Sequence, residues 1–172
     1  MRPAHHILQR RLETPLGPMT AARSAQGLSG LWFDGQRHHP GPLAVPVDPG
    51  DDALLVRTAA RLQAYFAGQP PHALPAPPPL DPQGTPFQRA VWQALLEIMP
   101  GQQRRYGELA RALGRPHAAR ALGAAVGRNP ISILIPCHRV LGADGSLTGY
   151  AGGLARKAAL LRLEGAAPGP IR

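Results

Sequence analysis

Ile135-Pro136-Cys137-His138-Arg139-Val140 is the stretch that holds the only cysteine of this 172-residue chain, directly after an apolar run. The thiolate is the reactive form of cysteine. A flanking histidine, nearby cations or a helix N-terminus can lower a thiol pKa from about 8.5 to about 3.5–7.5. This neighbourhood therefore predicts that Cys137 is a nucleophile. The alternative is a small buried hydrophobic residue, which is the common role of an isolated free cysteine.

The residues on both sides extend this pattern. Asn129-Pro130-Ile131-Ser132-Ile133-Leu134 precedes the stretch, and Gly149-Tyr150-Ala151-Gly152-Gly153-Leu154 follows it. Together the strings resemble the signature of the 6-O-alkylguanine-DNA alkyltransferases, a family that takes an alkyl group from a damaged base onto its own cysteine. The resemblance runs from about Thr85 to about Glu164 with the spacing between motifs kept. In the N-terminal half it is limited to the general layout.

The charge of the chain indicates a polyanionic partner. The formal net charge is +9, and residues 85–165 hold eleven arginines and lysines against four acids, whereas residues 1–84 are nearly balanced. We find no long apolar span or lipidation motif. We therefore expect double-stranded DNA with alkylated bases as the partner, and no membrane.

Cysteine and histidine usage limits the location and the ligands. One cysteine excludes an intramolecular disulfide, and the first five residues lack the apolar core of a signal peptide, so we expect the cytoplasm. Some members of the family bind zinc in the N-terminal half through cysteine and histidine, but here that half has no cysteine. We interpret the pairs His5-His6 and His38-His39 as solvated and expect no metal, no cofactor and a monomer.

The N-terminal half has the pattern of a small antiparallel sheet with a covering helix. Strands are predicted over 7–13, 19–23 and 28–33 between turn-like segments. Residues 51–67 have apolar positions at helical spacing, and Gly68 is placed to cap the end of that helix. A stiff Pro-rich stretch, 70–82, follows. We expect an α+β chain with three parts: a structural α/β domain over 1–78, a Pro-rich linker over 79–84 and a DNA-binding, alkyl-accepting domain over 85–172.

The C-terminal half is predicted to be mainly helical. Thr85-Pro86-Phe87-Gln88 has the pattern of a capping box with proline at the first helical position, and Pro100 ends the helix that follows. Helices over 106–113 and 117 to about 126, joined by a Gly-Arg-Pro turn, are typical of a helix-turn-helix. A last amphipathic helix is predicted over 154–164.

The second helix of this helix-turn-helix has an outward face with almost no side chains. Every residue over 118–127 is Ala or Gly except Arg120, Leu122 and Val126, and the last two form a core stripe. A helix that reads base edges needs Asn, Gln or several Arg, whereas a stripped helix can enter a narrow groove closely. The pattern therefore predicts minor-groove docking without sequence reading. Alternatively, the alanines are simply good helix formers.

The predicted DNA-binding residues are Arg104, Arg105, Ala118, Ala119, Arg120, Ala121 and Gly123. For Arg104 and Arg105, phosphate contact and a solvated face remain equal alternatives. The family resemblance implies that Arg120 enters the duplex and fills the gap left by an extruded nucleotide. Extrusion is required, because a thiolate cannot reach the 6-oxygen substituent of guanine inside a stacked duplex.

The resemblance also implies a set of catalytic residues. It implies that His138 acts through a water as the base for Cys137 and that Glu164 orients His138. From the residues alone, Glu164 would be a plain helix-end carboxylate. The resemblance gives Asn129 the role of bracing the active-site loop. Arg139 is interpreted as structural or phosphate-facing.

Further implied residues bind the flipped base. Tyr106 would donate to the ring nitrogen N3, and the backbone N–H of Ala151 would face the 6-oxygen. The carbonyls of Cys137 and Val140 would accept from the exocyclic amine, and Tyr150 would form a wall of the pocket. Ala151 often appears as serine in the family, which leaves the preference among alkyl groups open.

The resemblance thus implies that the protein flips 6-O-alkylguanine out of duplex DNA and transfers the alkyl group irreversibly to Cys137, once per molecule. Whether 4-O-alkylthymine is also a substrate stays open. One alternative is a non-catalytic module that flags alkylated bases, but such relatives replace the nucleophile. A Cys-His hydrolase is disfavoured, because His138 directly follows Cys137 and no Gly-rich oxyanion loop is evident.

Overall fold

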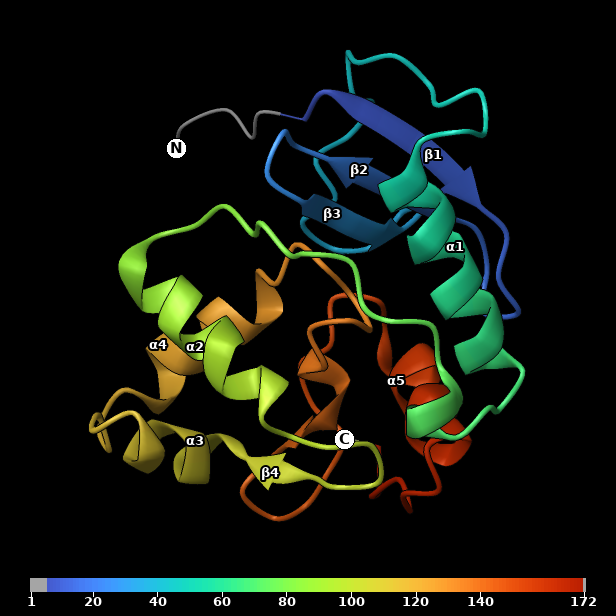
Figure 1. Ribbon diagram of the computed structural model, residues 1–172. Coiled ribbons are helices and arrows are strands. Elements are labelled where there is room, and N and C mark those ends of the chain that lie inside the picture. The colour runs from blue at the N-terminus through green and yellow to red at the C-terminus, as the bar shows by residue number, and fades with distance from the viewer. Residues whose placement is uncertain (1–5, 172) are drawn as a thin grey trace. The chain divides into compact units, whose positions relative to one another are not determined.

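Three short strands form an antiparallel sheet in the order β1-β2-β3 (Figure 1). In the computed structural model, which describes residues 6–171, they are β1 (Leu8–Leu12), β2 (Met19–Arg23) and β3 (Leu28–Phe33). All three predicted strands are present, and β1 is one residue shorter than predicted at each end. The register pairs Met19 with both Leu12 and Phe33, and it shifts between Ala22 and Arg23.

Helix α1 (Ala53–Phe66) packs against β1 and β2 and buries Leu55 and Leu62. It begins two residues later than predicted, because Asp52 is its N-cap: the carboxylate accepts from the backbone N–H groups of Leu54 and Leu55 at 3.1 and 3.0 Å. It ends before Gly68, whose φ of 73° provides the predicted left-handed cap.

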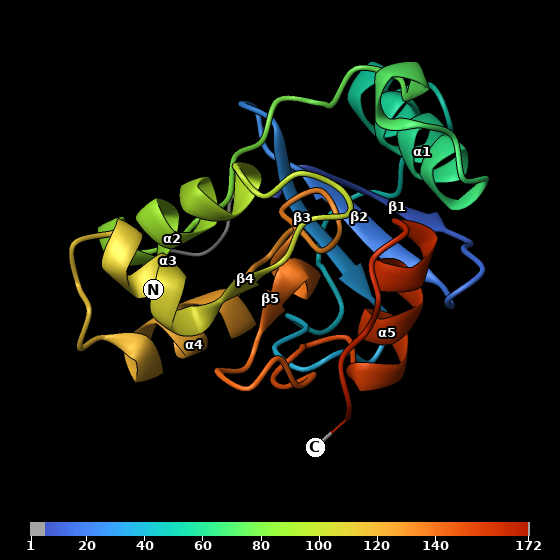
Figure 2. The ribbon, with the colours of Figure 1, turned by 90° about the horizontal axis from the view of Figure 1, so that it is seen from below.

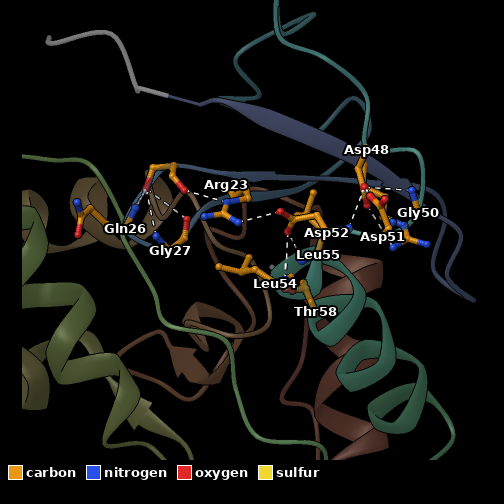
Figure 3. A network of polar contacts seen from close by, with 12 residues as sticks. Arg23, Gln26, Gly27, Asp48, Gly50, Asp51, Asp52, Leu54, Leu55 and Thr58 are labelled. Carbon is orange, nitrogen blue, oxygen red and sulfur yellow. Dashed lines mark hydrogen bonds and ion pairs between the residues drawn. The ribbon is translucent and has the colours of Figure 1, made fainter.

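A polar network fixes the entry of the chain into α1 (Figure 3). The buried carboxylate of Asp48 accepts from the backbone N–H groups of Gly50, Asp51 and Asp52. Arg23, at the end of β2, donates to Asp52 at 2.8 Å. The start of the helix is therefore hydrogen-bonded both to its own loop and to the sheet.

The Pro-rich stretch contains one turn of 3-10 helix, η1 (Pro71–Ala73), and ends beside β3. The N–H of Leu28 donates to the carbonyl of Pro79 at 2.8 Å, and the N–H of Asp81 donates to the carbonyl of Leu28 at 2.7 Å. A Cβ on Gly27 would lie 2.5 Å from the same Pro79 oxygen, so glycine is required there. The first residues of the predicted 79–84 linker thus pair with the sheet, and the chain divides into two units between Gln83 and Gly84.

Two of the N-terminal histidines, His6 and His39, differ from the prediction of solvated pairs, whereas His38 is exposed as predicted. His5 lies outside the described residues. His6 and His39 are partly buried, each edge-on to Trp32 at centroid distances of 5.5 and 5.8 Å, because this tryptophan offers them packing surface. Within residues 6–171, no group of three or more His, Cys, Asp or Glu side chains could hold a metal ion. No helix in the same range is long and apolar enough to cross a membrane.

Residues 84–171, the described part of the C-terminal unit, contain four α-helices: α2 (Pro86–Leu96), α3 (Tyr106–Ala112), α4 (Ala119–Gly127) and α5 (Leu154–Leu163). The predicted capping box is present at α2, where the side chain of Thr85 accepts from the N–H of Gln88 and the side chain of Gln88 accepts in return. Helix α2 packs against α4, and Trp92 donates to the carbonyl of Ala125 at 2.9 Å. The predicted α+β class is confirmed.

Two features of this unit differ from the prediction. Helix α4 begins at Ala119 and not at residue 117, because residues 116 and 117 are part of the preceding turn. A parallel pair of two-residue strands, β4 (Arg104–Arg105) and β5 (Val140–Leu141), was not predicted, and Figure 2 shows the two side by side. This pairing joins the start of α3 to the chain that directly follows Cys137.

Candidate active site

Cys137 begins η2 (Cys137–Arg139), a single turn of 3-10 helix, and is only 4% exposed. The loop before it is held by Asn129. The side-chain nitrogen of Asn129 donates to the carbonyl of Ile135 at 2.8 Å and lies 3.0 Å from Sγ of Cys137, and its oxygen accepts from the N–H of Ile131 at 2.9 Å. The structure thus brings two residues that are eight positions apart in sequence into direct contact.

The same loop contains a strained residue. Ile133 has a φ of 70°, in the left-handed region that β-branched residues rarely adopt, at a cost of about 1–3 kcal/mol. Its side chain is buried, as are those of Ile131 and Ile135. Burial of these three isoleucines therefore holds the backbone in the conformation that leads to Cys137.

A buried ionic network lies beside the thiol. Nε2 of His138 is 2.8 Å from one oxygen of Glu164, and Arg139 donates to both oxygens of the same carboxylate at 2.8 Å. Burial alone would raise the pKa of Glu164, but the hydrogen bonds from Arg139 and His138 lower it to about 2. Glu164 is therefore a carboxylate at neutral pH, which can only accept, so Nε2 of His138 carries a hydrogen.

His138 is neutral in this network. Its side chain has no exposed surface, and this burial lowers its pKa below 6.5 despite the opposing effect of Glu164. A neutral imidazole with its hydrogen on Nε2 has a lone pair on Nδ1. Nδ1 is buried, and no described residue provides it with a hydrogen-bond partner. The geometry therefore leaves this nitrogen available to accept a proton.

Arg139 has a structural role. Its side chain is 9% exposed, and besides the two bonds to Glu164 it donates to the carbonyl of Ile98. Three of its five N–H donors thus have partners inside the protein, which supports the structural alternative for Arg139.

The thiol itself has a high pKa in this state. Burial raises the pKa of Cys137, and the side chains of Asn129 and Lys157 and two backbone N–H groups offset this only in part. The neighbours that were predicted to activate the thiol are thus outweighed by desolvation. At neutral pH Cys137 is a protonated thiol, so its reaction requires a base.

Two tyrosines lie next to this thiol. Tyr106, at the start of α3, donates to the carbonyl of Gly149 at 3.3 Å, and burial together with the negative charge of a Cys137 thiolate raises its pKa to about 12. Tyr150 is buried, with its ring 6.5 Å from that of His138. Gly149 has a φ of 59°, and a Cβ there would lie 3.3 Å from the Tyr106 hydroxyl, so glycine allows this approach. Tyr106 remains a hydrogen-bond donor at physiological pH.

The remaining predicted base-binding residues are Ala151 and Val140. Ala151 comes directly after Tyr150 and is partly exposed. The carbonyl of Val140 accepts a hydrogen bond from Lys157, and a second lone pair remains for another donor.

Lys157 was not predicted as a site residue. A signal was present, since lysine occupies a position three residues after Leu154 and four before Leu161, on the apolar stripe of α5.

The predicted DNA-binding residues lie on or near α4 and on β4. Ala119, Arg120 and Ala121 are exposed, as are Arg104 and Arg105, and Ala118 is partly exposed. Gly123 is also partly exposed, and a Cβ there would lie 3.9 Å from the ring of Tyr106. The predicted core stripe of Leu122 and Val126 is buried. The small-residue face is thus directed to solvent at Arg120 and towards Tyr106 at Gly123.

Comparison with known proteins connects this site to a family. Residues 86–166 match the family model described as 6-O-methylguanine DNA methyltransferase, DNA binding domain. A methylated-DNA–protein-cysteine methyltransferase of Mycobacterium tuberculosis is 46% identical over 158 residues, which are 92% of each chain. One of Methanosarcina barkeri is 46% identical over 155 residues, 89% of this chain and 94% of that protein.

A solved structure agrees with these matches. The crystal structure of Mycobacterium tuberculosis OGT in complex with DNA superposes with a TM-score of 0.81 at 44% identity, covering 94% of this chain and 96% of that chain. The similarity therefore extends over both units, and the matched residues 86–166 of this chain contain Cys137, His138 and Glu164. On this evidence the chain belongs to the methylated-DNA–protein-cysteine methyltransferase family, whose members repair 6-O-methylguanine in DNA.

Proposed function

We propose that this protein repairs 6-O-alkylguanine in double-stranded DNA by transferring the alkyl group to Sγ of Cys137. The observation that carries the proposal is the buried Cys137 directly before a buried His138, whose Nε2 is 2.8 Å from Glu164 and whose Nδ1 has no hydrogen-bond partner among the described residues, so that it can accept a proton. Glu164 fixes the hydrogen on Nε2, so His138 is held in the form that a base requires. Family membership supports the same reaction.

The bonds change as follows. His138 takes the proton of Cys137 through a water molecule, and the thiolate attacks the alkyl carbon from the side opposite the 6-oxygen. The S–C bond forms as the C–O bond breaks, and guanine leaves with the electron pair and finally takes up the proton. Because a thioether is not reversed by water or cellular reductants, each molecule reacts once.

Pocket residues bind the flipped base in this scheme. The hydroxyl of Tyr106, protonated up to about pH 12, donates to N3 of the base, and the N–H of Ala151 faces the 6-oxygen. The carbonyls of Cys137 and Val140 accept from the exocyclic amine, and Tyr150 forms a wall. A base such as 4-O-alkylthymine, which also carries an alkylated oxygen, is a second substrate of the same chemistry.

DNA is bound by the C-terminal unit. Helix α4 enters the minor groove with its small-residue face, and Arg120 fills the gap left by the extruded nucleotide. Residues 1–78 have a structural role, and residues 79–84 link the two parts. The protein acts as a monomer. We assign it to the cytoplasm, because a reducing compartment preserves the free thiol of Cys137.

Intact mass spectrometry tests the reaction class. The protein is incubated with a duplex oligonucleotide that contains one 6-O-methylguanine, and its mass is compared before and after. We expect a gain of one methylene unit, mapped to Cys137 by peptide fragmentation. An unchanged mass with retained affinity for the modified duplex would favour a module that only flags lesions.

Arg120→Ala is expected to slow transfer from duplex DNA at least about tenfold and to leave transfer from the free base 6-O-methylguanine nearly unchanged. The reason is that Arg120 holds the extruded state, which costs a few kcal/mol, and does not take part in bond breaking. Single-turnover rates on both substrates measure the difference. Arg128→Ala, at the exposed other end of α4, is the matched control. Equal losses on both substrates would show that Arg120 acts in the pocket or in folding.

Arg104→Ala combined with Arg105→Ala is expected to flatten the salt dependence of DNA binding. Each neutralised phosphate contributes about 0.9 to the slope of log affinity against log salt on duplex DNA, so the slope should fall by up to about 2. Fluorescence anisotropy across salt concentrations, with duplexes of unrelated sequence, measures the slope. Arg37→Ala combined with Arg57→Ala removes the same charge from exposed positions of the other unit and is the control. An unchanged slope in the first variant would place both arginines on a solvated face.

A further inference from the structure

Lys157, in the middle of α5, is a lysine without exposed surface. Its ammonium group donates to two backbone carbonyls, those of Val140 and, at 2.8 Å, Thr148. Neither acceptor carries a full charge. Burial lowers the pKa of Lys157 to about 8, against the opposing effect of a negative charge on Cys137. At neutral pH the chain therefore keeps a buried cation whose hydrogen bonds go only to backbone oxygens.

These two carbonyls belong to the two segments that surround the thiol. Val140 is three residues after Cys137 and lies in β5, while Thr148 directly precedes Gly149 and Tyr150. Tyr106 binds the second segment as well, through the carbonyl of Gly149. The side chain of Lys157 therefore fixes the spacing between the segment that contains Cys137 and the segment that contains Tyr150.

Packing alone does not explain a lysine at this position. The burial of an ammonium group costs several kcal/mol, and an apolar residue of similar length would fill the same space next to Leu160 and Leu161 at lower cost. A lysine is useful here only if its charge or its donors are used. The charge has a partner when Cys137 loses its proton, since Lys157 is one of the groups that lower the pKa of this thiol.

The other ionisable groups near Cys137 do not provide this positive charge. Tyr106 and Tyr150 are neutral at physiological pH, since burial and the thiolate raise the pKa of both. His138 is neutral until it takes up the thiol proton, and Arg139 is paired with Glu164. Arg156 acts on Tyr150, whereas Lys157 acts on the thiol of Cys137 itself, and its hydrogen-bond partners are backbone carbonyls and not a carboxylate.

We propose that Lys157 is a positioning residue for alkyl transfer: its ammonium group joins the chain at Val140 and Thr148, and its charge stabilises the thiolate that forms at Cys137. This inference rests on the function proposed above. It predicts a separate property of the thiol that can be measured without DNA, because thiolate stability appears in the reaction of Cys137 with a simple alkylating reagent.

The experiment compares wild type with Lys157→Met and with Arg162→Met, which removes an exposed cation from the same helix. The rate of Cys137 modification by iodoacetamide is followed by mass spectrometry from pH 6 to pH 10. Below about pH 8, where Lys157 of wild type is charged, we expect the profile of Lys157→Met to move to higher pH, so that the rate there falls at least about tenfold, because an adjacent opposite charge lowers a pKa by about 1–3 units. Transfer from a 6-O-methylguanine duplex at pH 7 should fall at least about tenfold. Arg162→Met should match wild type in both assays.

Lys157→Met is expected to fold, because it replaces a buried cation with an apolar chain of similar length, and its thermal melting curve checks this. If it does not fold, Lys157→Gln, which is neutral but polar, replaces it in the same pH profile. A profile equal to that of wild type overturns the inference, even if transfer is slower, since a purely structural role slows transfer without moving the thiol pKa. If wild type itself transfers no alkyl group while the profile of the variant moves, the proposed function fails and the effect of Lys157 on the thiol stands.

Discussion

Cys137→Ala is expected to abolish alkyl transfer completely and to leave affinity for duplex DNA within about twofold of wild type. Cys137 is the only thiol of the chain, and no other group can accept the alkyl carbon in the scheme above. The residues assigned to DNA lie on or near α4 and on β4, outside the buried loop that holds Cys137. Because the change removes one buried atom, the expected loss of stability is on the order of 1 kcal/mol.

Cys137→Ser is the matched control for this prediction. A hydroxyl has nearly the same size and can still accept a hydrogen bond from Asn129, which lies 3.0 Å from the sulfur. Its pKa is far too high for His138 to produce an alkoxide, so transfer should be absent here as well. Mass spectrometry measures transfer, and anisotropy with a labelled modified duplex measures affinity. Methyl transfer by either variant would show that Cys137 is not the acceptor.

Glu164→Gln is expected to destabilise the protein by about 3–5 kcal/mol and to remove most of the transfer activity. The carboxylate is 2% exposed, and it accepts hydrogen bonds from His138 and, through both of its oxygens, from Arg139. A glutamine provides one acceptor oxygen and turns an N–H₂ group towards a donor. Arg139 then remains buried without a counter-charge, and the ring of His138 is no longer held with its hydrogen on Nε2.

Urea unfolding and single-turnover rates measure the two effects. Glu97→Gln, at an exposed position after α2, is the control and should change stability by less than about 0.5 kcal/mol. A Glu164→Gln variant that retains wild-type stability would show that the network contributes little to the fold. Wild-type transfer by a stable variant would show that Glu164 does not orient His138.

The pH dependence of wild type provides a second readout of Glu164. Its pKa is lowered from 4.5 to about 2 in the folded protein, so its contribution is fully present above pH 4.5 and is lost as the pH falls towards 2. This shift corresponds to a contribution on the order of 3 kcal/mol to the free energy of unfolding. In Glu164→Gln this part of the acid destabilisation should be missing.

Elements that depend on local residues could be predicted from the sequence. The capping box at Thr85 and the glycine at the end of α1 act within one turn, so their patterns are visible in a few residues. The pairing of β4 with β5 joins residues 36 positions apart and involves two residues on each side, which is too short for a periodic pattern. The pairing of β4 with β5 could not be predicted, because strands of two residues leave no pattern in the sequence.

The residues of the candidate site also divide into those that the local sequence indicates and those whose role depends on distant parts of the chain. His138 was found because it adjoins Cys137, whereas the position of Glu164 followed only from the family resemblance and not from the residues themselves. Lys157 and the direction of the Cys137 pKa shift were missed, because both depend on burial, which arises from the packing of α5 and the loops. Tertiary desolvation, and not the neighbouring residues, decides the state of the thiol.

The left-handed backbone of Ile133 has a consequence for newly synthesised protein. An isoleucine adopts this conformation only when burial of its side chain compensates for the strain, and that burial requires the surrounding core. The loop before Cys137 is therefore expected to be among the last segments to form as the chain leaves the ribosome. Until then the thiol is open to oxidants and to alkylating agents of any kind. The time from synthesis to the closure of this loop is thus the period in which a molecule can be lost before it meets damaged DNA.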